Sequence, residues 1–429
     1  MVLEDDLKHC LPDVMKKKLI LVTAQFPFGT SETFLETEIL YLADAFSTII
    51  ILPVEITENK RPLPKNVIVD KSLSDYTLLL NENRKSRFLK GIPTVLANSG
   101  FYTQVRKQPG RYLHPTGFKR MAMWAREAEL MGRFFKKYVT KQKLDTKSTL
   151  FYTYWFHLAT VALGKTLTQA KLISRAHRFD LYDEEGNPPY SNWKCLGLQH
   201  LDKLFLISDD GLEYMKRRYP EQSPKYEVSR LGVKDPGVAS KSSEDGVFRI
   251  ISVAGVREVK RVNLIVSSLR LLSEQNPELK IRWDHFGDGP LMETLKQQVK
   301  KKLAGKAEVV LHGMVPNSEV MKFYKTNPVD LFINVSSSEG IPVSIMEAQA
   351  FGVPVMATDV GGTSEIVNDE NGVLLTEHPE ARSIADLLLN LFKNKDELNK
   401  KRAEAKKSWE TRFQAENNYR EFSQKLAEL

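Results

Sequence analysis

The stretch SSSEGIPVSIMEAQAFGVPVMATDVGG, residues 336–362, carries the strongest signal for fold in this chain. The apolar run VDLFINVS (329–336) before it predicts a buried strand, and Pro342 suits a first helical position, where a missing N–H costs nothing. Glu339 then falls in the strand-to-helix loop and Glu347 on an early helical turn. The N–H groups and positive dipole end of such a helix suit phosphate, and carboxylates accept hydrogen bonds from hydroxyl groups. The stretch therefore predicts a site for a molecule with both phosphate and hydroxyl groups.

The second half of the chain alternates apolar strand candidates with helical segments. This order predicts βα units and a parallel sheet covered on both faces, and such sheets bind ligands at the carboxyl ends of their strands. Lys260, Gly287 and Glu339 are all expected just after such ends. The predicted strands are 248–255, 279–287, 307–313, 329–336, 353–359 and 371–376, and the predicted helices are 263–275, 290–302, 317–327, 344–352 and 379–394.

The first half of the chain has weaker signals. Residues 18–28, 48–54 and 202–208 are strand candidates, and the turn Gly29-Thr30-Ser31 is expected to cap a helix from Glu32 to Ala45. The segment 233–246 is rich in Gly, Ser, Lys and Pro, which predicts a linker. Two polar helical stretches are expected after Asn394.

Size and composition indicate an ordinary globular protein. The 429 residues suit two domains of roughly 200 residues each. Only two cysteines are present, which argues against a disulfide framework and suits a reducing compartment. The acidic beginning MVLEDDLKHC lacks an apolar signal core, and no apolar run is long enough to span a bilayer. We therefore expect a cytoplasmic protein.

The net charge of the chain is +8, and the positive charge is concentrated in residues 106–143. This segment contains 11 Lys or Arg and only two acidic residues, Glu127 and Glu129. Aromatic residues are interleaved with these cations. Such a segment suits an anionic membrane surface, and it equally suits a solvated helix face with core aromatics behind it. Nucleic acid is a weaker alternative, because no DNA- or RNA-binding motif accompanies the charge. A peripheral contact of residues 106–143 with the inner membrane face and a solvated helix face thus stay open as alternatives, and no nucleic-acid partner is expected.

The pair Glu339 and Glu347, with seven residues between them, resembles the E-x7-E signature of retaining GT-B glycosyltransferases, in particular glycosyltransferase family 4 (group 1). The surrounding GIPVSIMEAQAFGVPVMATDVGG is similar to that family as well. The resemblance implies an α/β fold with two Rossmann-like parallel-sheet domains facing an interdomain cleft. It implies an acceptor-binding domain (1–238), a nucleotide-sugar-binding domain (239–412) and a last helix (413–429) that crosses back to the first domain.

The resemblance also implies roles for residues of the second domain. Glu347 would hold ribose hydroxyls and Glu339 would hold the hydroxyls of the donor sugar. Lys260 matches the family's phosphate-binding lysine, whereas the family arginine falls on Gly255, so that Arg257 is a neighbouring candidate for phosphate. Backbone near Met314 would meet the nucleobase. The further donor-binding candidates are Gly287, Gly340, Ile341, Pro342, Val343 and Ser344.

In the first half, SRAH-x-x-D resembles the family's histidine motif and places His177 near the reacting sugar. Arg175 and Asp180 are candidates either to orient this imidazole or to bind the acceptor. The first loop makes Gly29 and Glu32 weaker acceptor-binding candidates, although Glu32 also suits a helix cap.

No Asp-x-Asp and no zinc-like Cys/His spacing occurs in the chain. A helix dipole with Lys260 would then have to stabilise the departing nucleotide, which agrees with a family that needs neither metal nor cofactor. The resemblance thus implies a metal-independent hexosyltransferase that moves a sugar from a nucleotide diphosphate sugar to a glycan or lipid-linked acceptor in cell-surface polysaccharide biosynthesis. The resemblance implies a front-face mechanism without a side-chain nucleophile.

Three alternatives remain open at this point. A nucleotide-sugar 2-epimerase on the same fold would bind the donor and need no acceptor. An NAD-dependent oxidoreductase is weakly supported, since FGTSET after the first strand lacks G-x-G-x-x-G. A basic binding module without catalysis would not depend on Lys260 or Glu339.

Overall fold

The structure is a computed structural model that describes residues 17–29, 31–79, 83–97, 101–102, 105–106, 109–182 and 193–429. Within this part the chain divides into two compact units, each described by itself below. The first unit holds the described parts of 1–176, 183–205 and 419–429. The second holds 177–182 and 206–418. The proposed domain boundaries at 238 and 412 stay a prediction.

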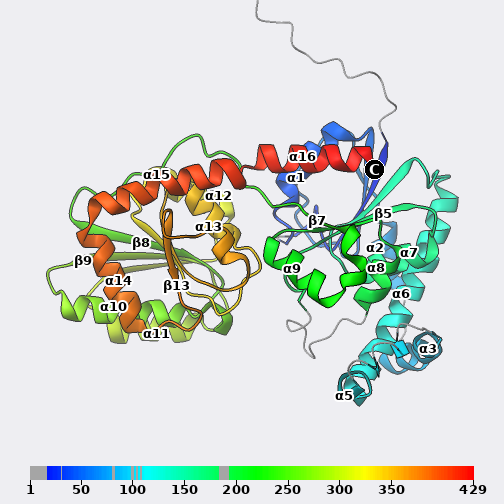
Figure 1. The fold of residues 1–429 in the computed structure, drawn as a ribbon, viewed down its shortest axis with the longest axis horizontal. Helices are drawn as coiled ribbons and strands as arrows, with labels where there is room; N and C mark the ends of the chain where they lie inside the picture. Colours follow the sequence, from blue (N-terminus) through cyan, green and yellow to red (C-terminus); the bar gives the residue numbers. More distant parts are fainter. Residues whose placement is uncertain are drawn as a thin grey trace, which may run out of the picture. The chain divides into compact units, whose positions relative to one another are not determined.

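The first half of the chain builds a seven-stranded sheet with the order β3-β2-β1-β4-β5-β6-β7. Figure 1 draws this part of the chain from blue to green, with β5 and β7 labelled. The central strand β1 pairs in parallel with β2 on one side and β4 on the other. Nearly all residues of β1 are buried, because helices cover both faces of such a sheet. The strands are β1 (Lys18–Thr23), β2 (Thr48–Pro53), β3 (Val67–Val69), β4 (Thr149–Thr153), β5 (Lys171–Ala176), β6 (Lys203–Leu206) and β7 (Tyr226–Val228).

Helices of the first half include a long basic helix, α6, which packs against α3 and α7. The aromatic residues in the last part of α6, Phe134, Phe135 and Tyr138, are buried, so they belong to the core and not to a membrane-facing surface. The helices are α1 (Leu35–Ala45), α2 (Ser72–Leu79), α3 (Arg84–Leu96), α5 (Pro109–Tyr112), α6 (Pro115–Lys141), α7 (Leu158–Thr166), α8 (Trp193–His200), α9 (Asp209–Arg218) and the short 3₁₀ helix η2 (Pro220–Lys225).

Two predicted boundaries in this half are wrong. The first strand ends at Thr23 and not at residue 28, and the first helix begins at Leu35 and not at Glu32. Glu32 has a left-handed backbone (φ 54°), which a helix cannot contain. Its carboxylate accepts hydrogen bonds from the backbone N–H groups of Ala24, Gln25 and Phe26, at 2.8, 2.8 and 2.6 Å, which holds the loop after β1 in a turn.

The second sheet has six strands in the order β10-β9-β8-β11-β12-β13, and its pairs are parallel. The predicted strands and helices of this half match the observed ones closely. The strands are β8 (Val247–Val253), β9 (Lys280–Phe286), β10 (Glu308–Gly313), β11 (Leu331–Asn334), β12 (Val355–Thr358) and β13 (Gly372–Leu375). The helices are η3 (Glu258–Lys260), α10 (Val262–Gln275), α11 (Met292–Leu303), α12 (Asn317–Thr326), α13 (Val343–Ala350), η4 (Gly361–Glu365), α14 (Ala381–Lys393), α15 (Lys395–Arg412) and α16 (Ala415–Glu428).

Two apolar cores hold these elements. The core of the second unit packs α10, α11 and α14 against the sheet around the fully buried Trp283. The core of the first unit contains Leu19 of β1 together with Phe422 and Leu426 of α16. The last helix of the chain is therefore part of the core that the first strand begins.

Candidate functional site

Glu339 lies in the loop between β11 and α13, as the sequence predicts, and only 8% of its surface is exposed. The Lys260 ammonium lies 2.6 Å from its Oε1 atom, and the Asn334 amide donates to the same oxygen at 3.1 Å. Burial raises the pKa of Glu339, but the charge and hydrogen bonds of Lys260, with Ser336 and Asn334, bring that pKa below its usual value. Glu339 is therefore ionised at neutral pH and accepts hydrogen bonds.

Glycines fix the position of this loop. Gly361 has φ +54°, and a Cβ atom there would lie 2.0 Å from the carbonyl oxygen of Glu339. The Gly362 N–H donates to the carbonyl of Gly340 at 2.7 Å. On the other side of the loop, a Cβ atom on Gly340 would lie 2.9 Å from the Cβ atom of Arg178. No side chain fits between these backbones, so each glycine is required by close approach.

The helix that follows begins at Val343, one residue before the predicted range 344–352, and Pro342 is its N-cap instead of its first residue. Ile341 and Pro342 are buried, whereas Val343 and Ser344 are partly exposed. The first turn of a helix has N–H groups without intrahelical acceptors and a positive dipole end. The segment from Gly340 to Ser344 thus places donors for an anion beside the Glu339 carboxylate.

Glu347 lies one turn further along α13. The amide of Asn317, the first residue of α12, donates to its Oε1 atom at 2.8 Å. Burial raises the pKa of the Glu347 carboxyl to about 7, and only the Asn317 hydrogen bond opposes this shift. Met314, in the loop before α12, is 75% exposed, which is unusual for so large an apolar side chain.

The loops after β8 and β9 are joined through their backbones. Gly287 has φ +136°, and a Cβ atom on it would lie 2.0 Å from the carbonyl oxygen of Ala254. The Val256 N–H donates to the carbonyl of Asp288 at 3.0 Å. Gly287 is therefore required by the approach of the protein's own backbone. The Arg257 side chain next to these loops is exposed.

Arg261 has a structural task at the same edge of the sheet. Its guanidinium donates to the carbonyl oxygens of Val335 and Ser336 at 2.6 and 2.8 Å, which secures the end of β11 to the start of α10. Lys260, Gly287, Met314 and Glu339 thus follow β8, β9, β10 and β11, whose carboxyl ends share one edge of the parallel sheet.

His177 follows β5 directly and is 7% exposed. Its backbone N–H donates to the Asp180 carboxylate at 2.7 Å, and its Nδ1 atom lies 3.6 Å from the other oxygen of that carboxylate. Asp180 therefore orients the His177 segment, one of the two roles that the sequence allowed. This segment clusters with the second unit, where Arg178 contacts the Gly340 backbone position.

The remaining first-half candidates have structural partners within the first unit. Gly29 has φ +62°, and a Cβ atom there would lie 2.8 Å from Thr57 Oγ1. Besides its backbone partners, Glu32 accepts a hydrogen bond from Trp155 Nε1 at 2.7 Å. Arg175 is fully buried, forms an ion pair with Glu38 and lies 4.1 Å from the Phe422 ring. This burial leaves Arg175 no exposed surface for an acceptor, and its contacts assign it to the core.

Sequence reasoning missed the polar partners of both carboxylates. Asn334 lies in a buried, otherwise apolar strand. A polar residue in such a strand needs a hydrogen-bond partner, so its presence was a signal for a buried polar contact. Asn317 lies at a helix start, where asparagine is common for local reasons, so its bond to Glu347 was invisible in the sequence.

Among the described residues no group of three or more His, Cys, Asp or Glu is placed to hold a metal ion. Likewise, none of the helices in the described ranges combines the length and apolar character needed to cross a membrane.

Residues 238–409 match the family model of "Glycosyl transferases group 1". The chain is also 27% identical over 215 residues to the amylovoran biosynthesis glycosyltransferase AmsK of Erwinia amylovora, which is 48% of this chain and 51% of AmsK. It is 32% identical over 171 residues to the putative colanic acid biosynthesis glycosyltransferase WcaL of Escherichia coli (strain K12), covering 38% of this chain and 41% of WcaL. The matches therefore span about half the length of these curated relatives or less.

The fold is similar to solved structures over nearly the whole chain. HepE of Anabaena, solved in complex with UDP, aligns with a TM-score of 0.62 at 15% sequence identity, over 96% of this chain and 100% of HepE. The two parallel-sheet Rossmann-like domains, with seven and six strands, match the GT-B glycosyltransferase fold. The predicted fold class is thereby confirmed.

Proposed function

We propose that this protein is a retaining glycosyltransferase of family 4 that uses a nucleotide diphosphate sugar as donor. One observation carries the proposal: an ionised carboxylate, Glu339, is held by Lys260 directly beside the N-terminus of α13. Hydroxyl-binding and phosphate-binding groups thus adjoin within a segment that matches group 1 glycosyl transferases. The UDP complex of the structural neighbour HepE supports a nucleotide donor.

In this proposal the donor spans the strand ends of the second unit. Glu347 accepts hydrogen bonds from the ribose, the N–H groups of residues 340–344 hold the diphosphate with Lys260 and Arg257, and Glu339 binds the sugar hydroxyls. The exposed Met314 lies beside the base, and His177 near the sugar. The bond between the anomeric carbon and the phosphate oxygen breaks, the acceptor oxygen bonds to that carbon, and the acceptor proton passes to the departing phosphate.

The acceptor and the setting belong to the same proposal. The names of AmsK and WcaL refer to exopolysaccharide biosynthesis, which supports a glycan or lipid-linked acceptor in a cell-surface pathway. We place the reaction in the cytoplasm with a peripheral contact at the inner membrane face. The dipole of α13 and Lys260 stabilise the leaving nucleotide, so neither a metal ion nor a cofactor is needed.

A ligand-binding experiment tests the donor site. Thermal unfolding is followed with UDP, GDP and ADP, and one nucleotide should raise the melting temperature, because binding to the native state stabilises it. E347Q should abolish this shift. E319Q, which alters an exposed carboxylate of α12, should leave it unchanged. Equal shifts in both variants, or no shift with any nucleotide, would contradict the proposed donor site.

A transfer assay separates the proposal from the epimerase alternative. Donor sugar should be consumed only when a saccharide or lipid-linked acceptor is present, and EDTA should leave the rate unchanged. An epimerised donor formed without any acceptor would overturn the transferase, and activity that EDTA removes would overturn metal independence.

A further inference from the structure

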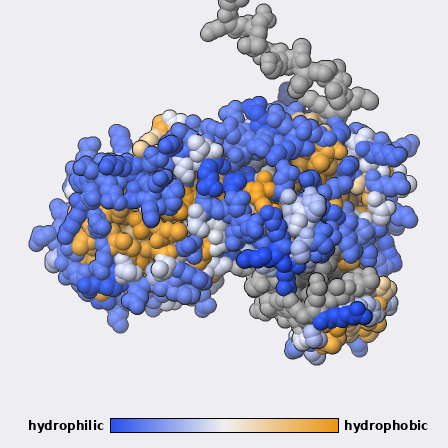
Figure 2. Space-filling view, viewed as in Figure 1, coloured by the Kyte–Doolittle hydropathy of each residue, from blue (hydrophilic) through white to orange (hydrophobic). Residues whose placement is uncertain are grey.

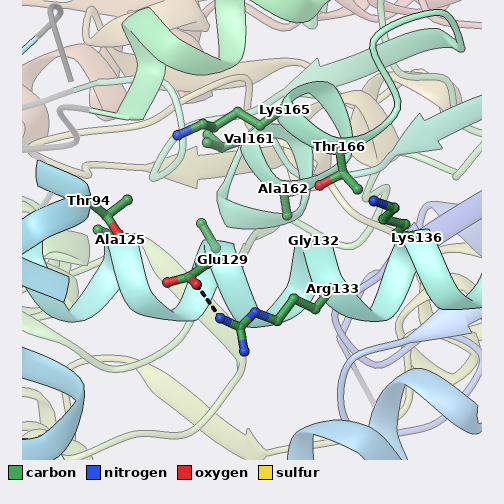
Figure 3. Close-up of a pocket in the computed structure, with 11 residues that line it drawn as sticks. Thr94, Ala125, Glu129, Gly132, Arg133, Lys136, Val161, Ala162, Lys165 and Thr166 are labelled. Carbon is green, nitrogen blue, oxygen red and sulfur yellow. Dashed lines mark hydrogen bonds and ion pairs between the residues drawn. The ribbon is translucent and has the colours of Figure 1, made fainter. Parts of the chain in front are cut away.

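A pocket of about 230 Å³ lies in the first unit between three helices (Figure 3). The long helix α6 forms one wall, α7 forms the opposite wall, and Thr94 of α3 lines one end. None of the residues proposed for the donor lines it. The lining residues are Thr94, Ala125, Ala128, Glu129, Gly132, Arg133, Lys136, Val161, Ala162, Lys165 and Thr166.

The floor of the pocket is apolar and made of small residues. Ala125 and Ala128 of α6 face Val161 and Ala162 of α7, and all four are buried. Gly132 sets the spacing of the two helices, since a Cβ atom there would lie 2.5 Å from Thr166 Oγ1. Short side chains on both walls leave an apolar hollow that water fills poorly and that a hydrocarbon chain would fill well.

The rim of the pocket is cationic. Its single acid, Glu129, already contacts Arg133 at 2.6 Å and Arg126 at 3.1 Å. The ammonium groups of Lys136 and Lys165 have no carboxylate partner within the described residues. Both lysines are exposed and both line the pocket, so the rim retains positive charge after its own acid is neutralised (Figure 3).

We infer that this pocket binds the phosphate-bearing end of a lipid, with the phosphate between Lys136 and Lys165 and the first carbons of the chain on the alanine floor. Both lysine side chains are exposed and can swing toward one phosphate, which accepts charge-assisted hydrogen bonds from their ammonium groups and from the Thr166 hydroxyl. A free phosphate or sugar phosphate would leave the apolar floor exposed to water. The inference rests on the lipid contact of the proposed function and names where it occurs, but it does not depend on the donor site.

The surrounding helices agree with a lipid source. Large apolar side chains of this helical region are exposed: Leu89 and Leu96 of α3, and Leu113 just before α6. Figure 2 shows apolar surface beside hydrophilic surface in the described part of this region. Isolated exposed leucines are ordinary, but three in one basic helical region suit the boundary between lipid headgroups and acyl chains.

A soluble lipid provides the probe. Dihexanoyl phosphatidic acid, below its micelle concentration and at low salt, should bind the full-length protein, and glycerol 3-phosphate, which lacks the chains, should bind about tenfold more weakly or not at all. K136A/K165A should weaken lipid binding about tenfold or more, since two charge-assisted contacts are lost. K136R/K165R, which keeps the charges, should restore most of the affinity.

The matched control removes two cations elsewhere on the same long helix. K119A/K137A changes the net charge equally but leaves the pocket lining intact, so it should bind the lipid as the wild type does. All three double variants alter exposed lysines, and an unchanged thermal unfolding curve checks that each is folded. Equal loss in both alanine variants would overturn the pocket in favour of general charge attraction. Glycerol 3-phosphate binding as tight as the lipid would overturn the lipid assignment.

Discussion

The ion pair of Lys260 with Glu339 shows how a single residue couples stability to the proposed chemistry. Lys260→Met leaves the nearly buried Glu339 without its cation. We expect the free energy of unfolding at pH 7 to fall by about 1–3 kcal/mol, less than for a fully buried pair because Lys260 is partly exposed. Urea unfolding of the variant and the wild type measures this difference.

The pH dependence of that difference has a definite sign. The folded pKa of Glu339 is lowered, so its stabilising contribution is present above the unfolded value of about 4.5 and is lost as the pH falls through the lower folded value. The wild type should therefore lose its advantage over K260M in acid. If the difference in the free energy of unfolding between the wild type and K260M stays constant from pH 7 to pH 3, the charge of Glu339 does not contribute to stability through this pair.

Glu347 has the opposite behaviour. Folding raises the pKa of the Glu347 carboxyl from 4.5 to about 7. Between these two pH values the unfolded chain has lost the proton while the folded protein still holds it. The free energy of unfolding therefore falls as the pH rises from about 4.5 to 7. Glu347→Gln removes this titration. We expect E347Q to be more stable than the wild type by about 1–3 kcal/mol at pH 8, and nearly equal to it at pH 4. Urea unfolding at the two pH values tests the prediction, and an E347Q variant less stable at pH 8 would contradict it.

At the scale of the residue, the sequence predicted the positions of the carboxylates but not their partners. The spacing of Glu339 and Glu347 follows from one loop and one helix, which are local features. The contacts of Arg175 with Glu38 and of Glu32 with Trp155 join residues more than a hundred positions apart. No pattern in a single sequence indicates such pairs, and for that reason the sequence leaves several roles open for Arg175 and Glu32.

At the scale of the element, the 3₁₀ helix η4 acts as a support for the Glu339 loop. Gly361→Ala would place a methyl group 2.0 Å from the Glu339 carbonyl oxygen at a left-handed backbone position, so the loop must shift. We expect G361A to lose nucleotide-induced thermal stabilisation and about 2–4 kcal/mol of stability. Gly237→Ala is the matched control, because Gly237 also has positive φ but open space around it, and it should cost about 1 kcal/mol. Similar behaviour of both variants would exclude a role for the close contact.

Elements were easier to predict in the second half than in the first. The strands of its parallel sheet are buried on both faces, so they are largely apolar runs such as LFIN and VMAT, separated by helices. In the first half, the predicted helix start failed because the Glu32 carboxylate binds backbone groups of the preceding loop. A hydrogen bond between a side chain and nearby backbone does not change the hydrophobic periodicity of the sequence, so the sequence pattern does not reveal it.

At the scale of the whole molecule, α16 belongs to the core of the first unit. Phe422 is buried, and its ring lies 5.0 Å from that of Phe205 and 5.8 Å from that of Tyr152. We expect Phe422→Ala to destabilise this core by about 3–5 kcal/mol. Hydrogen exchange should then accelerate in peptides of β1, β4 and β6 and stay unchanged in β8 and β9. Phe392→Ala makes the same test in the second unit, since Phe392 packs on Phe248 there. With this variant, exchange should accelerate in β8 and β9 and stay unchanged in β1, β4 and β6. Faster exchange in both sheets for either variant would contradict separate cores.

The place of α16 also bears on the order in which a nascent chain can acquire its structure. A ribosome makes β1 early, but the residues that complete the core around it, Phe422 and Leu426, emerge only after the entire second unit has been synthesised. The second unit therefore has its full set of core residues first, against the usual progression in which the earliest domain folds earliest. Until translation reaches α16, the apolar side chains that Phe422 and Leu426 cover stay open, and transiently exposed apolar surface of this kind is what chaperones protect.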